Sequence, residues 1–338
     1  MKRNKIAFAM CFLSFFSNAM NEIHDTNNSS FLLGVGIHPN EWSFPEDKMF
    51  SLLNIYHFNS FRTDYHWSNI ERKKGIYTVP QSNDESTINY LGDKKIKPLI
   101  ILGYSNPIYS GMKPIVPETV NGFCNFAAWT VKHFYNKQPI FEIWNEWSID
   151  PNNPKQAKSF TSALQYVDLV KSCSERMKAI DPNVKIIAGS FNPHKDSDLK
   201  WGMYLIKLGI MNYIDGLSLH SYNFSNNKSL DAERDVSEIV KLNANIKNVL
   251  GTSRDIPIYI TEVGVPTFYR YNFTPEVIGS YAQQFISNSR KYSYIKGVWW
   301  YDLINDGNSY SNGEMNFGLY YYNLNKKINE RFFLLKPY

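Results

Sequence analysis

Short apolar runs alternate along the chain with longer segments of helical period. The runs are rich in Val, Ile, Phe and Tyr, and there are eight of them: 31–38, 58–67, 96–104, 140–146, 184–190, 214–222, 256–264 and 295–303. Continuous apolar strands separated by helices are typical of a parallel sheet with both faces buried. Eight such units predict an α/β fold built as a single (β/α)8 barrel, the TIM barrel.

The same alternation is compatible with an open doubly wound sheet, but two observations favour the barrel. No Gly-rich phosphate-binding loop follows the first run, and nearly every run ends in polar or aromatic residues. These residues are His38, Arg62 with Asp64, Tyr104 with Asn106, Asn145 with Glu146, His220 with Tyr222, Glu262, and Trp300 with Asp302. A barrel gathers the carboxyl ends of all its strands on one face, whereas an open sheet does not.

The N-terminal segment has the pattern of a secretory signal peptide. A basic start, "MKRNK", precedes the apolar stretch "IAFAMCFLSFF", and Ser17-Asn18-Ala19 offers small residues for cleavage. A membrane anchor is the alternative, but the stretch is shorter than the roughly 20 residues that span a bilayer. We therefore predict a signal peptide over 1–19 and a periplasmic or extracellular location after cleavage near Ala19.

The rest of the chain, 20–338, is predicted to be one catalytic barrel domain. No shift in composition, low-complexity segment or internal repeat divides it, and no later segment resembles a transmembrane helix. Its last part, "NFGLYYYNLNKKINERFF", is predicted to form a turn and a closing helix packed on the barrel.

Composition and charge exclude some functions. The chain of 338 residues is 43% hydrophobic and 20% charged, which is ordinary for a folded protein. Signal cleavage lowers the formal charge from +5 to +2, because Lys2, Arg3 and Lys5 leave and no acid does. So weak a balance does not indicate a nucleic-acid partner, and nothing implies an obligate protein partner.

Two cysteines, Cys124 and Cys173, remain after cleavage, and an exported chain can join them in a disulfide. Both lie in segments of helical period, Cys124 near the start of one and Cys173 near the end of the next. If these helices run parallel outside the barrel, thiols at opposite ends cannot meet. We therefore expect two free thiols.

Glu146 and Glu262 end the fourth and seventh runs, so a barrel would bring them to one face. Cleavage of a glycosidic bond requires two facing carboxylates: one protonates the leaving oxygen, and the other meets the oxocarbenium-like carbon. At a separation of roughly 5–5.5 Å the second is a nucleophile and the anomeric configuration is retained. A Glu at a strand end is otherwise more often an ion-pair partner. The residues around each Glu therefore decide between a catalytic and a structural role.

The motifs around both glutamates resemble clan A of the glycoside hydrolases, which are retaining enzymes with (β/α)8 barrels. "EIWNEW" is similar to the clan's acid/base motif, and "IYITEVG" is similar to its nucleophile motif. "FRTDYHW" resembles the second strand with its Arg, "LSLHSY" the sixth with His and Tyr, and "VWWYDL" the eighth with its Trp. "LIILGYSNPIY" and "WWYDLINDG" most resemble family 39, with its β-xylosidases and exopolysaccharide-degrading relatives; the cellulase-like family 5 is the second choice.

The resemblance implies that Glu146 is the general acid/base and Glu262 the nucleophile of a retaining β-glycosidase. Its substrate would be an oligo- or polysaccharide, with an exopolysaccharide as one candidate. Asn145 is expected to donate its amide to the sugar's 2-hydroxyl, and Arg62 to hydrogen-bond Glu262 and keep it ionised. Three neighbours of Arg62 are interpreted as structural: Asp64, His66 and Trp67.

An acid catalyst must hold its proton near neutral pH, so Glu146 is expected to have a raised pKa. Burial against Trp144, Trp147 and Tyr222 would produce that shift. Tyr222 is also expected to hydrogen-bond the nucleophile, and His220 to bind substrate or to brace Glu146.

Adjacent strand residues point to opposite faces, so only one of Trp299 and Trp300 can face the sugar site. The resemblance makes Trp300 the floor, on which a sugar's C–H face stacks, and places Trp299 outward beneath a helix. His38 and Tyr104 are expected to be further substrate contacts.

Retaining hydrolysis by two glutamates needs neither metal nor cofactor, and the His, Cys and acidic residues show no tight ligand spacing. Two other functions stay open. One is a sugar-binding barrel that has lost activity, against which the presence of both glutamates with Asn145, Arg62 and Trp300 argues. The other is a transglycosylase that passes the same intermediate to a sugar acceptor.

Overall fold

The computed structural model describes residues 31–334 apart from 43, 225–229 and 269. The predicted signal peptide at 1–19 therefore lies outside the described residues. Within them, no helix combines the length and apolar character that crossing a membrane requires.

In the described part of the chain, eight parallel strands close into one barrel in sequence order. They are β1 (Leu32–Gly36), β2 (Ser60–His66), β3 (Lys97–Gly103), β4 (Ile140–Ile143), β5 (Lys185–Phe191), β6 (Gly216–His220), β7 (Ile258–Val263) and β8 (Ile295–Trp300). The predicted (β/α)8 barrel is confirmed. Each strand lies within its predicted run, except that β5 extends one residue beyond it.

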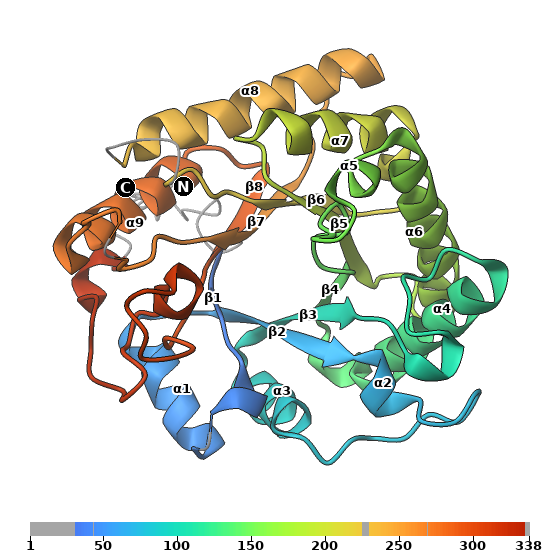
Figure 1. Cartoon of the computed structure of the whole chain (residues 1–338), viewed down its shortest axis with the longest axis horizontal. Helices are drawn as coiled ribbons and strands as arrows, with labels where there is room; N and C mark the ends of the chain where they lie inside the picture. Colours follow the sequence, from blue (N-terminus) through green and yellow to red (C-terminus); the bar gives the residue numbers. More distant parts are fainter. Residues whose placement is uncertain (1–30, 43, 225–229, 269, 335–338) are drawn as a thin grey trace, which may run out of the picture. The chain divides into compact units, whose positions relative to one another are not determined.

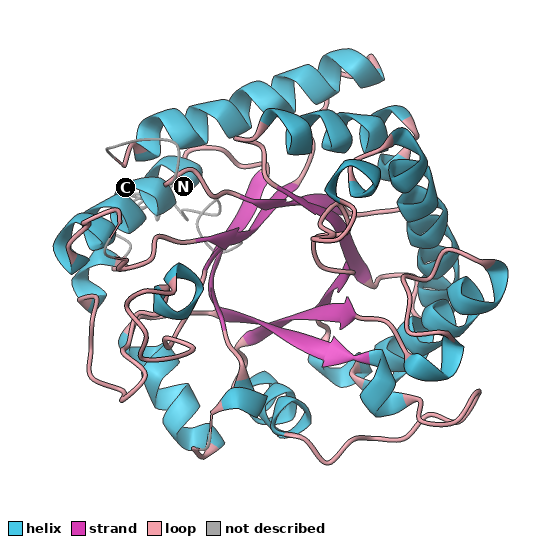
Figure 2. Cartoon of the chain, in the orientation of Figure 1, coloured by secondary structure: helices cyan, strands magenta, loops and turns pink. Residues whose placement is uncertain are grey.

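The helices surround the strands in a ring (Figure 1, Figure 2). They are α1 (Glu46–Ile55), α2 (Trp67–Ile70), α3 (Asn83–Asp93), α4 (Pro117–His133), α5 (Pro154–Ala157), α6 (Phe160–Ile180), α7 (Asp196–Lys207), α8 (Ala232–Leu250) and α9 (Pro275–Ser289). Short 3-10 turns are η1 (Pro39–Glu41), η2 (Pro107–Tyr109), η3 (Tyr135–Lys137), η4 (Ile210–Asn212), η5 (Gly313–Asn316) and η6 (Glu330–Phe332). Four helices begin after a side-chain cap that accepts a backbone N–H of the first turn: Ser82, Ser159, Asp231 and Thr274.

The core has two parts because strand side chains alternate between the barrel interior and the helices. The interior is filled by a small cluster: Leu99, Ile140, Ile187, Tyr259 and Trp299. A much larger cluster lies between the strands and the helices. This alternation fixes which side chains at the strand ends can reach the mouth of the barrel.

Trp299 and Trp300 point opposite to the prediction. Trp299 lies inside the barrel, beside Gly34 of the neighbouring strand β1. A Cβ at position 34 would overlap its indole ring. Trp300 faces the helix layer, with its ring 5.7 Å from that of Phe333. Adjacent residues do alternate between the two sides of the strand, but the space beside Gly34 decides that Trp299 is the one pointing into the barrel. The next residue on the same side is therefore Tyr301.

The closing segment forms no α-helix up to residue 334, contrary to the prediction. It consists of single β-bridges from Tyr320 to Ile304 and Lys326, followed by the 3-10 turn η6. Phe332 in that turn packs so closely on α9 that a Cβ at Gly279 would overlap its ring. The segment therefore closes the barrel by packing of its aromatic residues rather than by a long helix.

Cys124 and Cys173 form a disulfide between α4 and α6, with their Cα atoms 4.4 Å apart, so the prediction of free thiols is wrong. The two helices are staggered, and the second half of α6 lies beside the middle of α4. Arg176 of α6 accordingly donates from Nη1 to Oδ1 of Asn125 on α4 at 2.7 Å. The sequence pattern gives helix positions but not this stagger.

Replacing Cys124 and Cys173 together by Ala is expected to lower the free energy of unfolding by roughly 2–4 kcal/mol. The bond joins residues 49 positions apart and so restricts the unfolded chain. Urea unfolding with and without a reducing agent measures the effect. The reductant should lower the midpoint of the wild type and leave the double variant unchanged; an unchanged wild type would contradict the disulfide.

Candidate functional site

A cavity of about 540 Å³ opens where the carboxyl ends of the strands meet. Seven of the predicted site residues line it: His38, Arg62, Tyr104, Asn145, Glu146, Tyr222 and Glu262. His220 lies buried behind them and contacts both glutamates, whereas Trp300 faces the helices. The barrel therefore brings the strand ends together as expected, with one exception.

The chain leaves β4 through an unusual turn that aims two side chains into the cavity. Trp144 and Glu146 have positive φ angles of 63° and 49°, which non-glycine residues rarely adopt. Each such residue costs on the order of 1–3 kcal/mol and persists only where its surroundings hold it. Trp144 is held by the rings of Phe123 and Trp147, 5.7 and 5.3 Å away. Asn145 and Glu146 consequently face the cavity side by side.

Arg62 is the hub of the site and is almost fully buried. Its guanidinium donates from Nε to Glu142 Oε2 at 2.8 Å, from Nη1 to Glu262 Oε1 at 2.6 Å and from Nη2 to Asn145 Oδ1 at 2.7 Å. Burial acts to lower the pKa of Arg62, but the negative charges of Glu142 and Glu262 more than offset it and raise that pKa. Because Asn145 uses Oδ1 here, the group it offers to a ligand is its Nδ2 donor.

Glu142 is a site residue that sequence reasoning missed. It is fully buried inside the barrel, and its Oε1 accepts from Ser190 Oγ at 2.8 Å and from Thr261 Oγ1 at 3.1 Å. With the Arg62 bond on Oε2, both oxygens of this carboxylate are held. The signal was present in the alternation of β4, since Glu142 follows the inward-facing Ile140 by two residues.

Glu262 reaches the cavity through an irregularity in β7. The register shifts between Ile260 and Val263, so that Thr261 and Glu262 both face inward. Such bulges re-aim side chains beside functional sites. Tyr222 donates to Glu262 Oε2 at 2.6 Å, as expected, and the pKa of Tyr222 lies well above its usual value because of burial and the adjacent carboxylate. Glu262 is thus held through both oxygens.

Glu146 is paired with His220, whose Nδ1 lies 2.9 Å from Glu146 Oε1. Burial acts to raise the pKa of Glu146, but the hydrogen bond and charge of His220 more than offset it, so that this pKa is lowered. Burial acts to lower the pKa of His220, and the Glu262 charge and the Glu146 hydrogen bond raise it overall. The predicted upward shift for Glu146 is therefore wrong, because an imidazole is its partner. Both shifts favour a proton on the imidazole over one on the carboxyl group.

The tryptophans expected around Glu146 form its support rather than its wall. Trp147 is buried beneath the turn and donates from Nε1 to the carbonyl oxygen of Ser162 at 3.2 Å. The predicted bracing of Glu146 by His220 is present. One carboxylate oxygen of Glu146, one of Glu262 and a nitrogen of His220 all lie within 4.8 Å of one another.

Tyr301 lies where Trp300 is predicted to lie, at the cavity. It lines the cavity with Phe317, whose ring centroid is 5.4 Å away, and it meets the ring of His38 edge-on at 5.7 Å. Once Trp299 is known to face inward, the alternation predicts Tyr301 on the same side. The prediction misses Tyr301 because it assigns Trp300, rather than Trp299, to the inner side of the barrel.

Tyr104 also lines the cavity, and its hydroxyl donates to Asp64 Oδ1 at 2.7 Å. Asp64 and His66, which are interpreted from the sequence as structural neighbours of Arg62, also line the cavity. Aromatic faces combined with fixed polar groups suit a sugar, which offers both C–H faces and hydroxyl groups.

No protein-family profile and no curated relative matches the chain. Solved structures do match its fold. A family 39 glycoside hydrolase from Bacteroides cellulosilyticus WH2 aligns with a TM-score of 0.70 and 23% identity, over 88% of this chain and 61% of that one. Xylanase 10B from Thermotoga petrophila RKU-1 aligns with a TM-score of 0.64 and 15% identity, over 90% and 92%.

An exo-β-1,4-mannosidase from Opitutaceae bacterium strain TAV5 aligns with a TM-score of 0.62 and 16% identity, over 90% of this chain and 58% of that one. The chain thus spans less than two thirds of the length of the family 39 and mannosidase structures. At these identities the similarity establishes a shared barrel fold.

Proposed function

We propose that this protein is a retaining β-glycosidase of clan A that hydrolyses O-glycosidic bonds of an oligo- or polysaccharide. The observation that carries the proposal is the pair of glutamates at the barrel mouth, with oxygens within 4.8 Å of each other. Retaining enzymes keep their two carboxyl groups about 5–5.5 Å apart, whereas inverting enzymes leave room for a water between them. Family 39 is the proposed family, supported by the sequence motifs and by the shared fold.

Glu262 is the proposed nucleophile. Arg62 and Tyr222 donate to its two oxygens, which holds the carboxylate in one orientation toward the anomeric carbon. Its attack forms a glycosyl ester while the bond to the leaving oxygen breaks. Asn145 offers its amide to the sugar's 2-hydroxyl, a contact that strengthens in the transition state.

Glu146 is the proposed acid/base, and it works as a pair with His220. The pair carries one proton in the free protein, and Glu146 passes this proton to the leaving oxygen. In the second step water attacks the anomeric carbon, the ester bond to Glu262 breaks, and the water proton returns to the pair. Glu262 loses its charge in the ester, which removes one cause that raises the pKa of His220 and so favours the deprotonated pair that must accept the water proton.

The pair predicts a pH dependence. In the wild type, kcat/KM should fall as pH rises through the pKa of His220, which is raised above its usual 6.5, because the pair then loses its proton. Replacing His220 by Asn removes the imidazole, whose pKa is raised, and leaves the Glu146 carboxyl group alone, whose pKa the charge of Arg62 still acts to lower. The alkaline limb of the kcat/KM profile should therefore move to lower pH.

His66→Asn is the matched control, because His66 lines the same cavity and should leave that limb in place. If the alkaline limb of the kcat/KM profile does not move in His220→Asn, Glu146 and His220 do not share the catalytic proton.

The charges that line the cavity predict the substrate class. Beyond the two proposed catalytic residues, the described lining includes three acidic residues, Glu41, Asp64 and Glu314. Once Arg62 is engaged by its carboxylates, Lys195 is the lysine or arginine left in that described lining. Burial, followed by the negative charges of Glu146 and Glu262, raises the pKa of Glu314. A uronate would therefore meet like charges, whereas a neutral sugar or an amino sugar would not.

We expect kcat/KM for aryl β-glucosides, xylosides or glucosaminides to exceed that for the aryl β-glucuronide by at least about 10-fold, equivalent to 1.4 kcal/mol. Initial rates on this matched series measure the ratio, and Glu314→Gln should narrow it. Equal rates on the glucuronide would contradict this substrate preference.

Export completes the proposal. Cleavage near Ala19 would deliver residues 20–338 as one domain to the periplasm or the cell exterior, where an exopolysaccharide is one candidate substrate. The disulfide supports this location, since such bonds persist in oxidising compartments and are rare in the cytosol.

Product release from a panel of aryl β-glycosides and polysaccharides tests the function. The wild type should release sugar, and the double variant Glu146→Ala/Glu262→Ala should not. If the wild type binds sugars without releasing product on any substrate, the sugar-binding alternative holds instead. Mass spectra of the products separate hydrolysis from transfer to a sugar acceptor.

A further inference from the structure

Three groups of carboxylate and imidazole side chains in the described residues bring possible metal ligands within 4.8 Å of one another. They are Glu146 with His220 and Glu262, His194 with Asp235 and Glu238, and His38 with Asp302 and Asp306. The first group belongs to the site above, where its members are held by Arg62, Tyr222 and one another.

The second group is satisfied within the protein. His194 lies 2.5 Å from Glu238 Oε2 through Nδ1 and 2.7 Å from Ser221 Oγ through Nε2. Asp235 Oδ2 accepts from Tyr281 at 2.9 Å, and its Oδ1 accepts from Arg234 at 2.8 Å. These ligand atoms are therefore already engaged.

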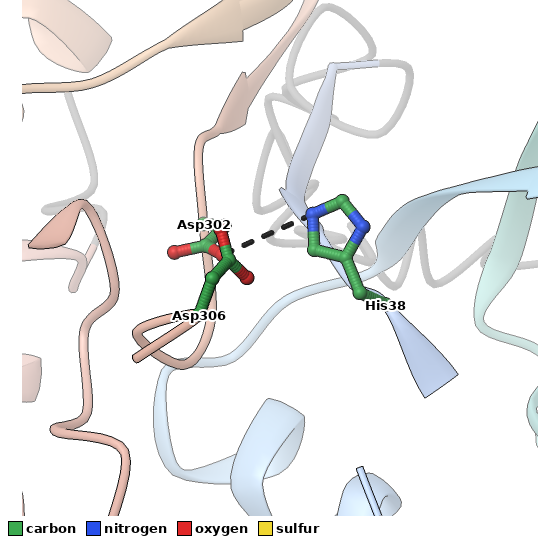
Figure 3. Close-up of side chains that lie close together, drawn as sticks. All are labelled: His38, Asp302 and Asp306. Atoms are coloured by element: carbon green, nitrogen blue, oxygen red, sulfur yellow. Dashed lines mark ion pairs between the residues drawn. The ribbon is translucent and has the colours of Figure 1, made fainter. Parts of the chain in front are cut away.

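The third group differs because, among the described residues, its ligand atoms lack partners outside the group. Figure 3 shows its three side chains, with the ion pair between His38 and Asp302 dashed. His38 comes from the segment after β1, and Asp302 and Asp306 come from the segment after β8. His38 Nε2 lies 3.9 Å from Asp302 Oδ2. Asp302 is fully buried, and among the described residues its carboxyl oxygens meet no donor except in the contact with the Asp306 carboxyl group, where the two groups can share a proton. His38 Nε2 and Asp306 Oδ1 have no partner outside this group among those residues.

Two neighbouring carboxyl groups in such a place either hold a proton or bind a compensating positive charge, because burial of an unpaired ion is costly. Burial and the neighbouring Asp306 raise the pKa of Asp302, which is the same cost seen without a cation. Lys327 is the buried ammonium of this region, but its Nζ donates to neutral oxygens of Asn305 and Asn316, each at 2.8 Å. Burial, opposed by the charge of Asp302, lowers the pKa of Lys327 to about 7. Its hydrogen bonds thus hold Lys327 on neutral oxygens rather than on either carboxyl group.

We propose that His38, Asp302 and Asp306 bind one divalent cation of the Zn²⁺ or Mn²⁺ type. One imidazole nitrogen with two carboxylates is a mixed ligand set that suits these ions, whereas Ca²⁺ and Mg²⁺ prefer oxygen ligands alone. Two carboxylates also balance the charge of the ion. The ligands come from opposite ends of the chain, which is why their spacing in the sequence gave no metal signal.

The cation would tie the segment after the first strand to the segment after the last, next to the cavity wall. His38 lines the cavity, and Tyr301, which precedes Asp302, lines it as well. The role is structural: the ion positions these two side chains, and no step of the proposed reaction passes through it.

Metal binding to the whole protein tests the inference independently of any glycosidase activity. Protein freed of affinity tag and stripped with a chelator is titrated with Zn²⁺, Mn²⁺, Ca²⁺ and Mg²⁺. Elemental analysis should find one Zn²⁺ or Mn²⁺ per chain. The unfolding midpoint should rise by about 4 °C when the free ion reaches a hundred times its Kd.

Asp302→Asn and Asp306→Asn should each remove most of this shift, whereas Glu238→Gln, in the satisfied group, should keep it. If one of the aspartate variants fails to fold, the other and the wild-type titration still decide. An unfolding midpoint that none of the ions changes overturns the metal site, and so does loss of the shift in Glu238→Gln alone. If the midpoint of the metal-free protein also falls as pH rises, the two carboxyl groups share a proton instead.

Discussion

Replacing Glu262 by Ala should lower kcat/KM on an activated aryl β-glycoside on the order of 10⁴-fold or more, because a covalent nucleophile is removed outright. The remaining cavity still binds the sugar through Asn145 and the aromatic walls, so KM should change far less than kcat. Steady-state kinetics of the wild type and the variant measure both parameters. A loss below about 10-fold would contradict the role of Glu262.

Sodium azide distinguishes the two glutamates. In Glu262→Ala, azide can occupy the space of the lost carboxylate and attack the anomeric carbon as the aryl group leaves, which gives a glycosyl azide of inverted configuration. In Glu146→Ala, azide enters in the second step from the face of the missing base and gives the retained configuration. NMR determines the anomeric configuration of each glycosyl azide and so assigns the roles of the two glutamates. If Glu262→Ala gives the retained product and Glu146→Ala the inverted one, the two roles are reversed.

Replacing Arg62 by Met should lower the free energy of unfolding by about 3–5 kcal/mol, because it leaves the fully buried carboxylate of Glu142 without its cation. Activity should fall as well, since Glu262 and Asn145 lose the guanidinium that holds them. Urea unfolding and steady-state kinetics measure the two effects separately.

The matched control is Arg62→Met combined with Glu142→Gln. Removing the buried charge together with its partner should recover a large part of the stability but not the activity. If Arg62→Met costs less than about 1 kcal/mol, or if the second substitution recovers nothing, Glu142 is not the group that depends on Arg62.

The fold was predictable from sequence because the strands of a parallel barrel are buried on both faces and therefore have continuous apolar sequences. Each run contained its strand apart from the last residue of β5, and the polar residues at the run ends lie at one mouth because all strands point the same way. The same logic placed Glu146 and Glu262 together, although they come from distant parts of the chain. These features depend on local composition and on one topological rule.

The features that were missed depend on how elements sit against each other. The phase of Trp299 and Trp300 is set by the empty volume beside Gly34 on a neighbouring strand. The disulfide depends on the stagger of α4 against α6. The lowered pKa of Glu146 requires its contact with His220, a residue from a different strand. None of these relations leaves a periodic trace in the sequence.

The central claim is that Glu262 forms a covalent bond to the sugar. A 2-deoxy-2-fluoro glycoside with a good leaving group tests it most directly, because the fluorine slows both steps and the leaving group restores only the first, so that the ester accumulates. Peptide mass spectrometry of the inactivated protein should find one sugar per chain, on Glu262, and none in Glu262→Ala. A label on another residue, or turnover with inverted configuration and no label, would contradict the account.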